Sequence, residues 1–207
     1  MLCLSQLLDM TIRFDFWPTF AFAVVMAAWF TFVASFVFHK KPPSPPDKKR
    51  DRSSIAGIAL QGAGYGIVWT VRRAWFTPIL PFGQTLEAVL AILTMALAAG
   101  SVWLCISAVR TLGQQWSLAA RVVEGHKLVT QGPYSVVRNP IYTGMLGMLV
   151  ATGLAISHWI GLLAGLVLFS LGTVIRVRSE AALLRETFGE EFAKYERQVP
   201  SVIPYLI

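Results

Sequence analysis

The side chains best suited to chemistry form two clusters in the second half of the chain. The first is the stretch 126–144, HKLVTQGPYSVVRNPIYTG, in which two prolines and Gly132 predict a stiff, compact loop. The second contains Arg176 and Glu180, which are four residues apart and therefore share one helix face. A guanidinium can bind a carboxylate or phosphate through two parallel hydrogen bonds, and a glutamate one turn away can face a cationic group.

Each of these residues also has a simpler interpretation. Asn139 stands before a proline, so it fits the N-cap of a following helix. Tyr134 and Tyr142 fit anchors at a membrane–water interface. Arg176 and Glu180 fit a surface ion pair, which contributes little to stability. The residue types alone leave both interpretations open.

The composition indicates an integral membrane protein. Of 207 residues, 55% are hydrophobic and only 14% are charged, whereas soluble domains carry about 25% charged residues. A helix of about 20 apolar residues crosses the hydrocarbon layer of a bilayer. Five apolar segments predict about five transmembrane helices, at 16–38, 55–71, 86–109, 142–157 (or 159) and 160–175. The first segment is too long for the apolar core of a signal peptide, so we interpret it as a retained helix.

The basic residues predict how these helices are oriented. Segments 39–53, 110–138 and 176–197 lie on one side of a five-span arrangement and carry six, four and five of the 18 basic residues. The other side holds Arg13, Arg72 and Arg73. The positive-inside rule then places the N-terminus outside and the C-terminus in the cytoplasm. Membrane topology and anionic lipids account for the net charge of +7, and we expect no nucleic-acid partner.

The chain divides into two regions by this pattern. Residues 1–109 hold three apolar helices and a basic, proline-rich linker at 39–54, which we expect to be extended and solvated. Residues 110–207 hold a cytoplasmic loop, a tight helical hairpin at 142–175 and a C-terminal amphipathic helix, with Gly189 as a turn or helix end. Cys3 and Cys105 form no disulfide or metal-binding pattern. The predicted fold class is an all-α integral membrane protein, with no metal.

The two chemical clusters together resemble the signature of the isoprenylcysteine carboxyl methyltransferase family. That signature has a histidine followed by LVT, then GPY, then R-H-P-x-Y-x-G, and later R-x-x-x-E, FGEE and VP. This chain has the corresponding motifs HKLVT, GPY, RNPIYTG, RVRSE, FGEEF and VP in the same order. The resemblance extends over about 115–207, close to half of the chain. The N-terminal half resembles the family only in being apolar and helical.

The resemblance implies S-adenosylmethionine as cofactor and a set of residues that bind it. These are His126, Lys127, Leu128, Val129, Tyr134, Asn139, Pro140, Ile141, Tyr142 and Glu180, with Glu124 as the nearest candidate for a further polar contact. Arg176 matches an arginine that serves the substrate, and it is our candidate catalytic and substrate-binding residue. One position departs from the family: Asn139 replaces the histidine of R-H-P, so it keeps hydrogen-bonding capacity but cannot carry a positive charge.

The function that this resemblance implies is methyl transfer to a lipophilic or lipidated substrate at the cytoplasmic face of a bacterial or archaeal membrane. A prenylcysteine-like carboxylate is the favoured acceptor, and a phospholipid amine or a thiol is the alternative. An NADPH-dependent membrane reductase of related helical design and a non-enzymatic membrane protein are the other two classes that the sequence leaves open. Membrane lipids are the other expected partners, and the sequence indicates no oligomeric state.

Overall fold

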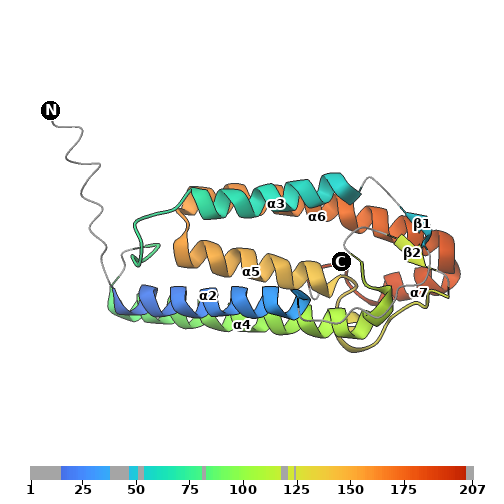
Figure 1. The fold of residues 1–207 in the computed structure, drawn as a ribbon, viewed down its shortest axis with the longest axis horizontal. Helices are drawn as coiled ribbons and strands as arrows, with labels where there is room; N and C mark the ends of the chain where they lie inside the picture. Colours follow the sequence, from blue (N-terminus) through green and yellow to red (C-terminus); the bar gives the residue numbers. More distant parts are fainter. Residues whose placement is uncertain are drawn as a thin grey trace.

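The computed structural model describes residues 15–37, 47–50, 54–80, 83–117, 121–123 and 125–203. Five long helices run roughly parallel, and short elements gather at one end of them (Figure 1). The long helices are α2 (Phe16–Val37), α3 (Ser54–Thr70), α4 (Gln84–Leu112), α5 (Pro140–Ile156) and α6 (Trp159–Phe188). The short elements are β1 (Asp47–Arg50), η1 (Gly113–Gln115), β2 (Arg121–Val123), η2 (Gly132–Ser135) and α7 (Glu190–Gln198).

The predicted all-α membrane fold is confirmed. Three helices, α2, α4 and α6, are long and apolar enough to cross a membrane, and α5 is a shorter apolar helix. Large apolar side chains point away from the bundle, and Phe30, Trp103 and Val167 are 76%, 68% and 60% exposed. Such outward apolar surface suits contact with lipid. That all five helices span the bilayer stays a prediction.

Helix α5 lies in the middle of the bundle, where it contacts α2, α3, α4 and α6. The most extensive contact of all joins α3 to α6, and it depends on glycine. A Cβ atom at Gly64 would lie 2.7 Å from the carbonyl oxygen of Gly165, and one at Gly172 would lie 2.6 Å from that of Gly57. Because no side chain fits there, the two backbones approach each other as closely as membrane helices do through small residues.

One predicted boundary is wrong. The last helix does not end near residue 175: α6 continues to Phe188, because residues 176–188 contain good helix formers and no glycine or proline. It ends at Gly189, whose φ of 51° lies in the left-handed region, and α7 follows directly. The part of the expected extended linker that the structure describes, Asp47–Arg50, is extended: it forms strand β1, which pairs antiparallel with β2.

Arg73 fixes the end of the bundle opposite the short elements. Its guanidinium donates hydrogen bonds to the carbonyl oxygens of Leu154, Ala155 and Ser157 at 2.8, 2.9 and 2.6 Å, and its Nε donates to Thr77. The last carbonyls of a helix have no partner within the helix. Arg73 therefore satisfies the C-terminus of α5 with a positive charge, which also suits the helix dipole.

Replacing Arg73 by alanine is expected to lower the free energy of unfolding by about 2–4 kcal/mol, because several buried carbonyls lose a charged donor at once. Thermal denaturation in detergent measures the loss. Arg72→Ala is the matched control, since the exposed Arg72 only covers the ring of Trp75 at 4.7 Å and should cost at most about 1 kcal/mol. Equal effects of the two substitutions would contradict the capping role.

Candidate active site

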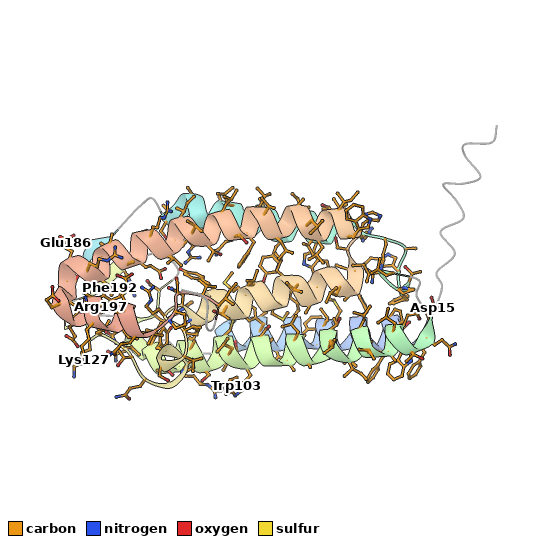
Figure 2. The ribbon with its side chains drawn as sticks, turned by 180° about the vertical axis from the view of Figure 1, so that it is seen from behind. Asp15, Trp103, Lys127, Glu186, Phe192 and Arg197 are labelled. Atoms are coloured by element: carbon orange, nitrogen blue, oxygen red, sulfur yellow. The ribbon has the colours of Figure 1, made fainter. Side chains whose placement is uncertain are left out.

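A cavity of about 390 Å³ lies at the end of the bundle that carries the short elements. Figure 2 shows Lys127, Phe192 and Arg197 at this end and Asp15 at the opposite one. The volume falls within the range of about 300–1,000 Å³ that is usual for small-molecule sites. Its wall includes ten of the predicted site residues: His126, Lys127, Leu128, Val129, Tyr134, Asn139, Ile141, Tyr142, Arg176 and Glu180.

Of the predicted residues that the structure describes, Pro140 is not on that wall. Pro140 is buried at the first turn of α5, where its fixed φ suits a helix start, and it lies beside the cavity without lining it. Glu124 lies outside the described residues. The structure thus brings together residues from the loop, η2, α5 and α6, whereas their individual roles stay predictions.

Arg176, Tyr142 and Glu180 form one polar group on the wall. Arg176 is 5% exposed, and its guanidinium carbon lies 4.7 Å from the centre of the Tyr142 ring. The Tyr142 hydroxyl donates a hydrogen bond to Glu180. The surface ion pair is therefore the wrong interpretation, because Arg176 is buried and an aromatic ring from α5 packs on its guanidinium. The interfacial-anchor interpretation of the tyrosines is also wrong, since Tyr134 and Tyr142 are 7% and 4% exposed.

The loop 126–129 closes the cavity from the side of α4. The backbone N–H of Lys127 donates to the side-chain oxygen of Gln115 at 2.6 Å, which fixes the loop on the end of α4. The His126 ring packs against Phe188 with 5.8 Å between ring centres. Burial, together with the positive charge of Arg121, holds the pKa of His126 below its ordinary value of 6.5. His126 therefore presents a neutral imidazole to the cavity near pH 7.

His126 also has an unsatisfied polar atom that a ligand could pair with. Its Nδ1 atom is buried and has no hydrogen-bond partner within the described part of the chain. A buried polar atom of this kind is costly unless a ligand or water satisfies it. Together with the cavity volume and the nearby Glu180, it fits a polar, positively charged cofactor such as the one that the resemblance implies.

Asn139 occupies the predicted N-cap position of α5, but its side chain does not cap the helix. The side-chain amide donates to the carbonyl oxygen of Ser201 at 3.0 Å and to its hydroxyl at 3.2 Å. The backbone N–H of Asn139 donates to the same carbonyl at 2.9 Å, and that of Arg138 donates to Pro200. Asparagine at this position thus fastens the segment after α7 onto the start of α5.

Helix α7 is held by a second set of polar contacts. Glu196 accepts hydrogen bonds from Arg138 at 2.5 Å and from Arg185 at 2.7 Å. Burial alone would raise the pKa of Glu196, but the two arginines outweigh it and lower that pKa below its ordinary value. The Tyr195 hydroxyl donates to the carbonyl oxygen of Tyr134 at 2.6 Å. The apolar side chains of the predicted C-terminal amphipathic helix form one cluster, which includes Leu184 and Phe188 of α6 and Phe192 and Tyr195 of α7.

Sequence reasoning missed several residues of this site. They are Gln61, which accepts a hydrogen bond from Arg176, together with Gln115 and Ser201. Gln61 did offer a signal, because it is an amide side chain within an apolar segment, where polar residues are rare and often functional. Gln115 and Ser201 offered none, since polar residues are common in loops.

Asn139→Ala is expected to loosen the segment after α7, because two side-chain hydrogen bonds to Ser201 are lost while the backbone bonds remain. The cost should be about 1–2 kcal/mol. Limited proteolysis of the C-terminal segment measures it. Ser201→Ala is the matched variant: it removes only the hydroxyl acceptor and should increase cleavage less. Cleavage of Asn139→Ala at the wild-type rate would rule out the fastening role.

Lowering the pH below 6.5 should destabilise the wild-type fold more than a His126→Gln variant. The unfolded chain takes up a proton on this histidine near pH 6.5, whereas the folded chain does so only at its lower folded pKa. The stability due to neutral His126 is therefore fully present above pH 6.5 and is lost as the pH falls toward the folded pKa, by up to about 1.4 kcal/mol per pH unit.

Thermal unfolding midpoints of both proteins across this pH range test the idea. His158→Gln, which changes an exposed histidine at the start of α6, should keep the wild-type pH dependence. If His126→Gln loses as much stability on acidification as the wild type does, the pH dependence comes from other groups.

Known proteins match the part of the chain that carries most of the cavity wall. Residues 89–191, about half of the chain, match the family model described as phospholipid methyltransferase (PEMT). The chain is 31% identical over 102 residues to protein-S-isoprenylcysteine O-methyltransferase B of Arabidopsis thaliana. The aligned region covers 48% of this chain and 52% of that protein. The chain is 34% identical over 103 residues to the Schizosaccharomyces pombe protein-S-isoprenylcysteine O-methyltransferase, covering 48% and 43%.

The similarity extends to a bacterial protein with a different name. A nickel-cobalt-cadmium resistance protein of Alcaligenes xylosoxydans xylosoxydans is 39% identical to this chain over 100 residues. The aligned region covers 46% of this chain and 45% of that protein. The chain spans about half the length of the curated relatives that it matches. The matched region contains His126, Asn139 and Arg176 with most of the cavity wall. By these matches, the chain belongs to the family that the phospholipid methyltransferase (PEMT) model describes, and over about half of its length it is similar to isoprenylcysteine O-methyltransferases.

Proposed function

We propose that this protein transfers a methyl group from S-adenosylmethionine to the carboxylate of a lipophilic acceptor of the S-prenylcysteine type. The observation that carries the proposal is a cavity whose wall combines the buried Arg176 with the His126 loop and Glu180. The names of the isoprenylcysteine O-methyltransferases support the same chemistry.

Arg176 is the proposed clamp for the acceptor. Its position is fixed by burial and by the Tyr142 ring, so a carboxylate that reaches the wall meets a preorganised guanidinium. A clamp of this kind accelerates transfer by holding the attacking oxygen in line with the methyl carbon. The carboxylate is already ionised, and no general base is needed.

The other residues of the wall are proposed to hold the cofactor. Bound S-adenosylmethionine would supply a methyl group on a positively charged sulfur, which departs as a neutral sulfide when the acceptor oxygen forms its bond to carbon. Glu180, which accepts the hydrogen bond of Tyr142, places negative charge near the cationic end of the cofactor. The neutral His126 adds no repelling positive charge. The apolar wall excludes water, which strengthens these electrostatic contacts.

The location of the cavity supports the proposed orientation, in which this end of the bundle faces the cytoplasm and the N-terminus lies outside. Lys127 and Arg197 lie at the cavity end (Figure 2), and basic residues favour the cytoplasmic side. A soluble cofactor enters such a site from the cytoplasm. An apolar acceptor reaches it through the bilayer, which the exposed apolar flanks of α2 and α6 contact.

A phospholipid amine is the second candidate acceptor, because the matching family model carries that description. Arg176 favours the carboxylate, since a guanidinium repels a protonated amine and binds an anion. The test supplies purified protein in lipid nanodiscs with methyl-labelled S-adenosylmethionine and either N-acetyl-S-farnesylcysteine or phosphatidylethanolamine. Base-labile label, released as methanol, identifies a methyl ester. Base-stable label in the phospholipid would instead support the amine acceptor and overturn the carboxylate.

Substitution of Arg176 separates the clamp from cofactor binding. Arg176→Ala is expected to lower kcat/KM for the prenylcysteine acceptor by about 100-fold or more, because a buried charged hydrogen-bond donor is lost. Binding of S-adenosylhomocysteine, measured by calorimetry, should change little. Glu180→Gln should give the reverse pattern, with weaker cofactor binding and a smaller effect on the acceptor KM. An Arg176→Ala enzyme with wild-type kinetics would remove the clamp.

A further inference from the structure

Gln61 connects Arg176 to the N-terminal half of the chain. It lies on α3, is 2% exposed, and falls outside the region that matches the family model. Its side-chain oxygen accepts a hydrogen bond from Nη1 of Arg176 at 3.0 Å, and its side-chain nitrogen donates to the Thr173 hydroxyl at 2.9 Å. Thr173 in turn donates to the carbonyl oxygen of Phe169. A chain of hydrogen bonds thus crosses the contact between α3 and α6.

The direction of every bond in this chain is determined. A guanidinium can only donate, so the oxygen of Gln61 must face Arg176. The Thr173 hydroxyl donates its proton to the carbonyl oxygen of Phe169, so it must accept a hydrogen bond from the side-chain nitrogen of Gln61. A neutral side chain that accepts at one end and donates at the other is therefore required here. Glutamate would neutralise the arginine, and an apolar residue would leave buried polar atoms unpaired.

The backbone around Arg176 allows the side chain to follow this course. A Cβ atom at Gly57, one turn before Gln61, would lie 2.5 Å from Cγ of Arg176, so the arginine stem packs directly on the α3 backbone. Tyr142 from α5 covers the guanidinium on another side. Three helices therefore define the position of one charge, and Gln61 supplies a neutral polar contact to it.

We infer that Gln61 is a positioning residue for the methyl acceptor: it fixes the guanidinium of Arg176 at the cavity wall through a neutral hydrogen bond that adds no negative charge beside it. The inference rests on the proposed function of Arg176 as a carboxylate clamp. It assigns part of acceptor recognition to α3, a helix in which the sequence motifs of the family do not occur.

Kinetics of Gln61→Leu and Gln61→Glu test the inference in the full-length protein in nanodiscs. Gln61→Leu should lower kcat/KM for N-acetyl-S-farnesylcysteine by about 10- to 100-fold, as expected for loss of one hydrogen bond to a charged group, with an unchanged KM for S-adenosylmethionine. Gln61→Glu keeps an acceptor for Arg176 but cancels its charge, so its effect should appear mainly as a higher acceptor KM. Unchanged acceptor kinetics in Gln61→Leu would overturn the inference.

Two further variants separate positioning from a general loss of stability. Thr173→Val removes the hydroxyl that orients Gln61 and should lower acceptor kcat/KM in the same way, even if Gln61→Leu folds poorly. Thr94→Val is the matched control, because Thr94 is an equally buried threonine that bonds to its own helix at Leu90, away from this cavity, and should retain wild-type kinetics. In an Arg176→Ala background, Gln61→Leu should add no further loss if Gln61 acts through Arg176. Additive losses would contradict this.

Ligand binding without catalysis distinguishes failure of this inference from failure of the proposed function. Thermal stabilisation is compared between N-acetyl-S-farnesylcysteine and its methyl ester, which lacks the negative charge. The wild type should prefer the acid, and Gln61→Leu should lose most of that preference. If the wild type prefers the acid but transfers no methyl group, the proposed function fails while the positioning role stands. If the wild type shows no preference, the positioning role fails.

Discussion

A buried arginine in an apolar helix bundle requires a complete set of polar and aromatic neighbours, and the cavity end of this protein is arranged around that requirement. Arg176 is 5% exposed and lies beside helices built from apolar residues. An unpaired charge would be expensive there. The contacts that offset this cost come from Gln61 on α3 and Tyr142 on α5, and both depend on helix positions set elsewhere. The glycine contacts between α3 and α6 bring Gln61 within reach, and the central position of α5 brings the tyrosine.

The irregular backbone that roofs the cavity follows a second constraint, that exposed backbone groups cannot face lipid. Side chains and neighbouring backbone satisfy it. Gln115 accepts from the loop that follows β2, and the segment after α7 bonds to the start of α5 through Arg138 and Asn139. The contacts of Glu196 with two arginines add charge to the same junction. The roof is therefore fixed by Gln115, Arg138 and Asn139 on one side and by Glu196, Pro200 and Ser201 on the other.

The apolar segments predicted the five long helices closely, because charge-free runs of this length have few alternatives to a membrane helix. Ends were less predictable: nothing in residues 176–188 marks where α6 leaves the membrane, since the same helix continues with charged residues. The loop motifs predicted which residues share a cavity, yet they gave no information about Gln61. Its hydrogen bond to Arg176, 115 residues away in sequence, depends on the spacing between α3 and α6. Asn139 shows the same limit. Its place before Pro140 predicted a helix N-cap, whereas its side chain bonds to Ser201, 62 residues away.

These long-range contacts indicate how relatives that share half of this chain can differ in what they act upon. The proposed cofactor residues on the cavity wall lie within 126–142 and at Glu180, all inside the region that matches the family model. The charge that would meet the acceptor is positioned in part by α3, which lies outside that region. Phe32 of α2, also outside it, contributes to the cavity wall. Changes in α2 and α3 can therefore alter the proposed acceptor side of the cavity while the residues proposed to hold the cofactor stay in place, because the latter lie in the loop, η2, α5 and α6.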